Sequence, residues 1–147
     1  MRSTSTIYRN QWNNFGFSLI ELMIVVVIGG ILAGLAYPSF TQSLYKARRT
    51  DGIEALLGLQ QAQERWRSNH TQYATLSLLG LPTSSTKGYY ILSLADNPSA
   101  TGYSAIATAA QGSSQFNDHP CQTLRVDVNP ANNPGQTLYS PSVCWSQ

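Results

Sequence analysis

The feature that most constrains this chain is a long apolar run that begins at Phe17. No charged residue occurs between Leu22 and Tyr37, and about 20 apolar residues are enough for a helix to cross a bilayer. One carboxylate, Glu21, lies near the start of the run. A carboxylate at the centre of a membrane costs on the order of 2.5–3.5 kcal/mol, so the presence of Glu21 in this run needs a physical reason.

A cut of the chain between Gly16 and Phe17 would supply a cation for this carboxylate. The new α-amino group of Phe17 would lie one helical turn from Glu21, but within one chain it also belongs to the positive end of the helix dipole. Between chains staggered along a filament, the amine of one chain would meet Glu21 of another, and an opposite charge neutralises a buried carboxylate. The alternative is a solvated glutamate at a membrane boundary.

The residues around this cut resemble the cleavage signature of type IV prepilins and read Gly16-Phe17-Ser18-Leu19-Ile20-Glu21. In that family the prepilin peptidase cuts after the glycine and methylates the new N-terminal phenylalanine. The resemblance therefore implies a cleaved leader over residues 1–16, processing at Gly16 and Phe17, and an assembly role for Glu21.

Pro38 resembles the proline that bends the N-terminal helix in many type IV pilins. A proline in a helix interior costs about 3 kcal/mol and removes one backbone hydrogen bond. Gly29, Gly30 and Gly34 precede it, and each costs about 1 kcal/mol relative to alanine. The stretch from Gly30 to Pro38 is therefore expected to be the weakest part of the helix, like the stretch that unwinds in assembled pili.

Two other kinds of N-terminal segment explain the run less well. An ordinary secretory signal has an apolar core of about 7–15 residues followed by its cleavage site, whereas this run is longer and the cut precedes it. A plain membrane anchor accounts for the run but not for the signature in front of it.

The charges of the chain separate the leader from the rest. The 147 residues carry 9 Lys and Arg against 7 Asp and Glu, and two of the basic residues, Arg2 and Arg9, lie in the leader. Leader arginines favour the cytoplasmic side of the inner membrane, so the C-terminal region is expected outside it, and on an extracellular pilus after assembly. Cleavage would leave 7 basic and 7 acidic residues, with no extended basic patch for nucleic acid.

Two cysteines, Cys121 and Cys144, lie near the C-terminus. An even pair in an exported domain implies a disulfide more often than two free thiols, and closing a loop of this size is worth roughly 3–3.5 kcal/mol. A metal site that also uses His70 or His119 is the alternative, but the Cys and His spacing does not support it. We expect no metal and no cofactor.

The helical pattern continues beyond Pro38 to about Arg67, with Ser68 to Thr71 ending it. Apolar residues recur at mostly three- to four-residue spacing, which is typical of a helix with one buried face; they are Leu44, Ile53, Leu56, Leu57, Leu59, Ala62 and Trp66. The charged residues between them are expected around that face and are Lys46, Arg48, Arg49, Asp51, Glu54, Glu64, Arg65 and Arg67. Gly52 and Gly58 weaken the helix.

Short strands follow a polar loop over residues 68–87. The pattern predicts strands over residues 88–94, 103–108, 123–128 and 138–139, with turns over residues 96–99 and 129–135. Four tyrosines are expected as half-buried strand residues: Tyr89, Tyr90, Tyr103 and Tyr139. Antiparallel strands packed on one long helix match the type IV pilin fold, an α+β fold with a disulfide-bounded C-terminal loop.

The expected organisation is a leader over residues 1–16, an apolar transmembrane or filament-core helix over residues 17–40, and one pilin domain over residues 41–147. The sequence carries no catalytic pattern, since the two histidines are far apart and Ser113 and Ser114 lack a nucleophile elbow. We therefore expect a structural protein and not an enzyme.

The resemblance is greatest to minor pilins of the PilE class, which help pilus assembly, twitching motility and adhesion. It implies that other major and minor pilins, the prepilin peptidase and the inner-membrane assembly platform are partners. One alternative is a pseudopilin of type II secretion, against which the cysteine pair counts modestly. The other is a DNA-receptor pilin for natural transformation, for which a basic stripe would have to form from Arg65, Arg67, Lys87 and Arg125.

Overall fold

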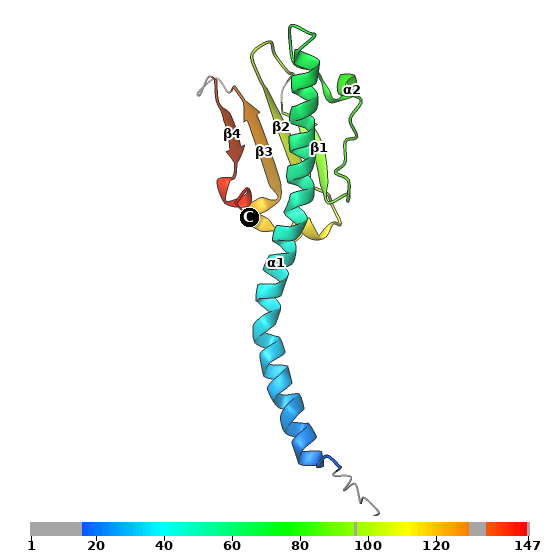
Figure 1. Cartoon of the computed structure of the whole chain (residues 1–147), viewed down its shortest axis with the longest axis vertical. Helices are drawn as coiled ribbons and strands as arrows, with labels where there is room; N and C mark the ends of the chain where they lie inside the picture. Colours follow the sequence, from blue (N-terminus) through cyan, green and yellow to red (C-terminus); the bar gives the residue numbers. More distant parts are fainter. Residues whose placement is uncertain (1–15, 96, 130–134, 147) are drawn as a thin grey trace, which may run out of the picture. The chain divides into compact units, whose positions relative to one another are not determined.

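A computed structural model describes residues 16–95, 97–129 and 135–146. One long helix, α1 (Leu19–Arg67), precedes a four-stranded antiparallel sheet (Figure 1). The strands are β1 (Tyr90–Leu94), β2 (Tyr103–Ala109), β3 (Thr123–Val128) and β4 (Thr137–Ser140). The short helices are α2 (Leu76–Leu79) and the 3-10 helices η1 (Ser114–Asn117), η2 (His119–Cys121) and η3 (Ser142–Cys144). This architecture confirms the predicted pilin-type α+β fold.

Helix α1 passes without a break through the glycines of the apolar run and through Pro38. It begins at Leu19, two residues later than predicted, and the carbonyl of Ser18 accepts a hydrogen bond from the Leu22 amide at 3.2 Å. It ends at Arg67, as predicted. An acidic first turn and a basic last turn complement the helix dipole.

The chain divides between Pro38 and Ser39 into two units, and α1 contributes residues to both. We call residues 39–147 the C-terminal unit. The leader limit at residue 16 and the domain limit at residue 40 stay predictions.

The sheet is a simple meander in which each strand pairs with the next one along the chain, in the order β1-β2-β3-β4. β3 has the predicted limits, and β2 extends one residue further than predicted. β1 starts at Tyr90 and not at residue 88, because Gly88 takes a positive φ of 73° in the turn before it. β4 is four residues long, longer than the predicted pair at 138–139.

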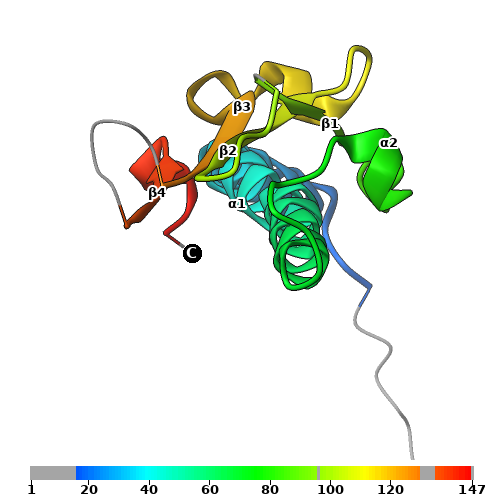
Figure 2. The ribbon, with the colours of Figure 1, turned by 90° about the horizontal axis from the view of Figure 1, so that it is seen from above.

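The core of the C-terminal unit lies between one face of the sheet and the second half of α1, which runs along the sheet (Figure 2). Leu56 and Leu59 of α1 and Leu124 and Val126 of β3 are essentially fully buried there. Gly52 allows the close approach, because a Cβ at this position would lie 2.8 Å from the ring of Tyr90. The predicted weakening at Gly52 is thus accompanied by a packing role.

The connection between α1 and β1 contains the short helix α2, where the sequence predicted only loop. Gly80 ends α2 with a left-handed φ of 63°, a conformation that glycine adopts without steric cost. Four residues are too few for helical periodicity to be visible in the sequence, which is why the prediction missed it.

The burial of the four tyrosines differs more than expected. Tyr90 and Tyr103 are buried, Tyr89 precedes β1 and is half-buried, and Tyr139 of β4 is exposed. Burial raises the pKa of the Tyr90 and Tyr103 hydroxyls. The prediction that all four are half-buried strand residues is therefore wrong, because alternation along a strand does not say how deeply a sheet face is covered.

Candidate functional site

The apolar part of α1 exposes its side chains. All the large apolar residues from Leu19 to Phe40 are at least half exposed, and Phe17 is 84% exposed. By length and composition, α1 could cross a membrane. A contiguous apolar surface of this size needs a lipid or protein environment, because its transfer from water is favourable.

The predicted processing residues lie just before this surface. Gly16, Phe17 and Ser18 are exposed and precede the first turn of α1. Glu21 lies in that first turn and is also exposed, and within the described residues no hydrogen bond or ion pair reaches its carboxylate. The structure therefore presents an apolar surface with one charge near its N-terminal end.

Pro38 lies inside α1, close to the division between the two units. A proline lacks the amide that would donate to the carbonyl four residues earlier, which here belongs to Gly34. A Cβ built at Gly34 would meet no atom within 4 Å. The helix nevertheless continues, so the bend predicted at Pro38 stays a prediction.

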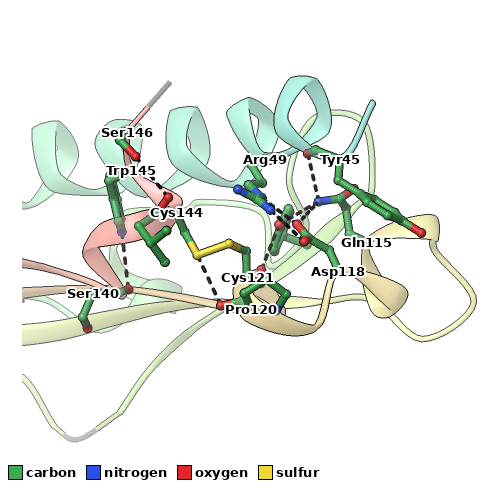
Figure 3. Close-up of a disulfide and its surroundings, with 12 residues drawn as sticks. Tyr45, Arg49, Gln115, Asp118, Pro120, Cys121, Ser140, Cys144, Trp145 and Ser146 are labelled. Carbon is green, nitrogen blue, oxygen red and sulfur yellow. Dashed lines mark hydrogen bonds and ion pairs between the residues drawn. A yellow bond between two sulfur atoms is a disulfide. The ribbon is translucent and has the colours of Figure 1, made fainter. Parts of the chain in front are cut away.

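The second candidate region surrounds the disulfide between Cys121 of η2 and Cys144 of η3 (Figure 3). The two Cα atoms lie 5.7 Å apart and both residues are buried. The disulfide joins the segment before β3 to the segment after β4. The expected disulfide is thus present. In the described part of the chain, no three His, Cys, Asp or Glu side chains form a group that could hold a metal ion, which the alternative would require.

A buried ion pair lies beside the disulfide (Figure 3). Arg49 Nε donates to Asp118 Oδ2 at 2.6 Å, and Arg49 Nη2 donates to Asp118 Oδ1 at 2.8 Å. This contact raises the pKa of Arg49, chiefly through the hydrogen bond to Asp118. The bidentate pair links α1 to Asp118, which lies between η1 and η2.

Gln115 and Tyr90 extend this pair into a network. Gln115 Nε2 donates to Asp118 Oδ2 at 3.2 Å and to the Tyr90 hydroxyl at 3.1 Å. The Tyr90 hydroxyl in turn donates to the carbonyl of Cys121 at 3.2 Å. One set of buried hydrogen bonds therefore joins the helix, the sheet and the disulfide segment. Such a network stabilises most when all its members are satisfied, and here Gln115 Oε1 has no partner among the described residues.

The sequence placed Arg49 and Asp51 among the charges around the helix, and this expectation is wrong. Both residues are buried, because partners far along the chain satisfy them. One signal was available for Arg49: it precedes Ile53 by four residues and Leu56 by seven, so helical spacing puts it on the buried face. Asp118 and Gln115 carried no such signal.

The basic residues proposed for a DNA stripe have different surroundings. Arg125 lies on β3 and pairs with Asp127 at 2.8 Å. Arg67 donates to the carbonyls of His70 and Ala100 and lies over the Tyr73 ring. Arg65 and Lys87 are exposed on α1 and before β1, and no contact among the described residues joins the four into one cluster.

The histidines have separate surroundings as well. His70 stacks on Trp66 with ring centroids 3.8 Å apart, whereas His119 is exposed in η2. Among the described residues, neither histidine belongs to a group of three or more His, Cys, Asp or Glu side chains that could hold a metal ion.

Comparison with known families gives two matches that divide the chain. A model described as the prokaryotic N-terminal methylation motif matches residues 13–37. A model described as the type IV minor pilin ComP, DNA uptake sequence receptor, matches residues 38–125.

Individual relatives include pilins and a secretion protein. The type II secretion system core protein G of Klebsiella pneumoniae is 28% identical over 108 residues, which are 66% of this chain and 77% of that protein. A fimbrial protein of Neisseria meningitidis serogroup A is 32% identical over 105 residues, 70% of this chain and 58% of that protein. The type IV major pilin PilA of Myxococcus xanthus is 41% identical over 61 residues, 42% of this chain and 28% of that protein.

These matches agree with an exposed apolar helix that leads into a disulfide-bonded α+β unit. Pilins are structural proteins that assemble into filaments and associate with membranes, and both features suit the exposed apolar part of α1. Because the ComP model covers more than half of its residues, the chain belongs to the type IV pilin family, in the group of ComP minor pilins.

Proposed function

We propose that this chain is a minor subunit of a type IV pilus. The observation that carries the proposal is the exposed apolar surface of α1, which lies directly behind a prepilin-type processing sequence. A prepilin peptidase would cut between Gly16 and Phe17 and methylate the new amino group. The exposed position of both residues before the helix supports access for the enzyme.

The subunit would first be held in the inner membrane by α1, with the C-terminal unit outside the cell's cytoplasm. The two arginines of the leader support this orientation, because Lys and Arg are retained on the cytoplasmic side. The assembly platform of the inner membrane would then transfer it to the pilus, where the apolar surfaces of neighbouring helices replace lipid.

In the filament, Glu21 would pair with the Phe17 amine of a neighbouring subunit. The absence of any partner for this carboxylate within the described residues supports an intermolecular one. Removing one member of a buried ion pair leaves an uncompensated charge, which is strongly unfavourable. The pairing would therefore favour the correct stagger between subunits.

The test is the variant Glu21→Ala, with Glu54→Ala as the matched control. Glu54 is also exposed and lies on α1, but in the C-terminal unit. Pili are sheared from cells, and this protein is quantified in the pilus and membrane fractions by mass spectrometry. We expect Glu21→Ala to be processed at Phe17 but depleted from pili, and Glu54→Ala to be incorporated normally. Normal incorporation of Glu21→Ala would contradict the proposed pairing of Glu21 with the Phe17 amine.

The same fractions separate a pilus subunit from a type II secretion pseudopilin, the class of the Klebsiella relative. A processed wild-type chain found in low amount in sheared pili supports the minor pilin. A processed chain that stays in the membrane fraction would move the proposal to the secretion system.

DNA reception is a second candidate function, because the matching family is described as a DNA uptake sequence receptor. The exposed Arg65 and Lys87 are the residues we would test, since Arg67 donates to backbone carbonyls and the charge of Arg125 is balanced by Asp127. Duplex DNA binding by the full-length protein in detergent should weaken steeply with salt if phosphate contacts dominate. The double variant Arg65→Gln, Lys87→Gln should then reduce the salt dependence, whereas salt-independent or absent binding would exclude this function.

A further inference from the structure

A polar hollow of about 360 Å³ lies beside the paired strands β2 and β3. It is found where β2 begins and β3 ends, next to the turn between β1 and β2. Its lining residues include Asn97, Ser99, Thr101, Ser104, Arg125 and Asp127. Leu124 and Val126 of β3 are buried under the sheet, so the alternation of a strand puts Arg125 and Asp127 on the opposite face. Arg125 and Asp127 thus line the hollow from the face of the sheet opposite the core, while Tyr103, a core residue, also contributes to its lining.

Close contacts hold the walls of this hollow together. Gly102 lies so near the end of β3 that a Cβ there would be 2.3 Å from the carbonyl oxygen of Val128. Asn129 Nδ2 donates to the carbonyl of Thr101 at 2.6 Å. Ser99 Oγ accepts hydrogen bonds from the amides of Thr101 and Gly102. A site whose walls are already ordered loses less entropy when it binds a ligand.

The Arg125–Asp127 pair offers donors and acceptors side by side. Arg125 Nε donates to both carboxylate oxygens of Asp127 at 2.8 Å, and Ser104 Oγ donates to Oδ1 at 2.5 Å. Within the described residues, both Nη groups of Arg125 remain without a partner, and the Arg125 side chain is 42% exposed. The pair carries no net charge, yet it can both donate to and accept from a ligand.

This chemistry matches a sugar better than a phosphate. A hydroxyl is at once a donor and an acceptor, so neighbouring sugar hydroxyls can donate to Asp127 and accept from the free Nη groups of Arg125. A phosphodiester or an ionised carboxylate is acceptor-only and would meet the Asp127 carboxylate, and the named lining residues include no lysine. The volume falls within the range of about 300–1,000 Å³ that is usual for small-molecule sites.

We propose that this hollow binds a neutral hexose unit of a surface glycan. Binding by the isolated chain does not require pilus assembly, so a failure here would be distinct from a failure of the proposed pilin function. Asp127 and Arg125 would contact the sugar hydroxyls, and Asn97, which is exposed, would contact it from the turn after β1.

The experiment uses the full-length protein in a zwitterionic detergent without a sugar head group. The probes are the methyl glycosides of glucose, galactose, mannose and N-acetylglucosamine, with methyl sialoside and duplex DNA as anionic comparisons. Binding is measured by saturation-transfer NMR, with the glycosides at millimolar concentrations. We expect at least one glycoside to bind, with at least a tenfold loss of affinity in Asp127→Ala and a smaller loss in Asn97→Ala. Glu54→Ala, which removes an exposed carboxylate outside the hollow, should bind like the wild type.

Circular dichroism of each variant tests whether the fold is kept, and Asn97→Ala provides a second measurement because its side chain has no hydrogen bond within the described residues. The proposal is overturned if none of the four glycosides binds. It is also overturned if binding survives unchanged in both Asp127→Ala and Asn97→Ala, or if only methyl sialoside or duplex DNA binds.

Discussion

At the scale of single residues, three buried polar side chains of α1 hold the rest of the C-terminal unit in place. Arg49 holds the segment between η1 and η2 through Asp118. Asp51 accepts from the Ser85 hydroxyl at 2.5 Å and from the Lys87 amide at 2.9 Å. Gln63 exchanges two hydrogen bonds with the backbone of Ala74. Each group is costly to bury alone, and these partners offset that cost.

Tyr90 and Tyr103 allow a matched test of hydroxyl pairing. The Tyr90 hydroxyl has two hydrogen-bond partners, whereas the buried Tyr103 hydroxyl has none among the described residues. We expect Tyr90→Phe to lower the free energy of unfolding by about 1–3 kcal/mol, because Gln115 and the Cys121 carbonyl lose a partner. Tyr103→Phe should be neutral or stabilising.

Urea denaturation followed by tryptophan fluorescence measures both variants in the full-length protein. A larger loss for Tyr103→Phe than for Tyr90→Phe would contradict this assignment of the two hydroxyls.

The same tyrosines predict a loss of stability at alkaline pH. Burial raises the pKa of both hydroxyls above the ordinary value of 10.0, so the unfolded chain releases protons at a lower pH than the folded one. Their contribution is complete below pH 10 and falls as the pH rises towards the folded-state pKa. Unfolding measured at a series of pH values should show this fall, and it should be shallower in Tyr103→Phe; identical slopes would refute the explanation.

At the scale of elements, α1 combines two different kinds of helix. Its first half presents apolar side chains on its whole circumference, whereas its second half buries one face against the sheet.

The edge strand β1 is covered by the segment that precedes it. The Leu92 amide of β1 donates to the Thr83 carbonyl at 2.7 Å, and the Ser85 amide donates to the Tyr90 carbonyl at 2.9 Å. Such covering of an edge strand prevents unwanted pairing.

Two glycines in the second half of α1 should respond in opposite directions to alanine. A Cβ at Gly52 would lie 2.8 Å from the Tyr90 ring, while one at Gly58 meets nothing within 4 Å. We expect Gly58→Ala to stabilise by about 0.5–1 kcal/mol through helix propensity. Gly52→Ala should destabilise, because overpacking costs about 1–3 kcal/mol and outweighs that gain.

Thermal unfolding of the two variants, recorded side by side with the wild type, gives the signs directly. If Gly52→Ala also raised the melting temperature, the close packing of α1 on Tyr90 would not be a constraint.

At the scale of the whole molecule, the chain places its apolar residues in two different roles. Those of residues 17–40 are largely exposed and suit a filament or a membrane, and those of the C-terminal unit form a small core. That core contains three alanines of β2, namely Ala105, Ala107 and Ala109. Small side chains bury little apolar area each, so covalent and polar links matter more to the stability of this unit.

The disulfide should therefore contribute measurably to stability. We expect the double variant Cys121→Ser, Cys144→Ser to unfold at a lower urea concentration than the wild type. Its free energy of unfolding should be lower by roughly 3–3.5 kcal/mol, the value for a loop of this size. A reductant should shift the wild-type transition in the same direction and leave the double variant unchanged. Equal midpoints for wild type and variant would show that the buried network alone holds the C-terminal segment.

Sequence patterns could predict some of the candidate sites but not others. The pairing of Cys121 with Cys144 was expected from the sequence and is present, whereas the roles of Gly16, Phe17 and Glu21 follow from the resemblance and stay predictions. The polar hollow was not, because it forms from residues 97–104 and 125–129, which only the pairing of β2 with β3 brings together.

By itself, the sequence determined the long helix, the apolar surface of its first half and the limits of β3. These features depend on interactions between residues a few positions apart, so periodicity and composition are sufficient to predict them. Only the tertiary structure decided that Arg49 and Asp51 are buried, that Tyr90 and Tyr103 differ in pairing, and that Gly52 touches the sheet. The physical reason is that their partners lie far along the chain, 69 residues away for Arg49 and Asp118, and only folding brings those partners close enough to offset the cost of burial.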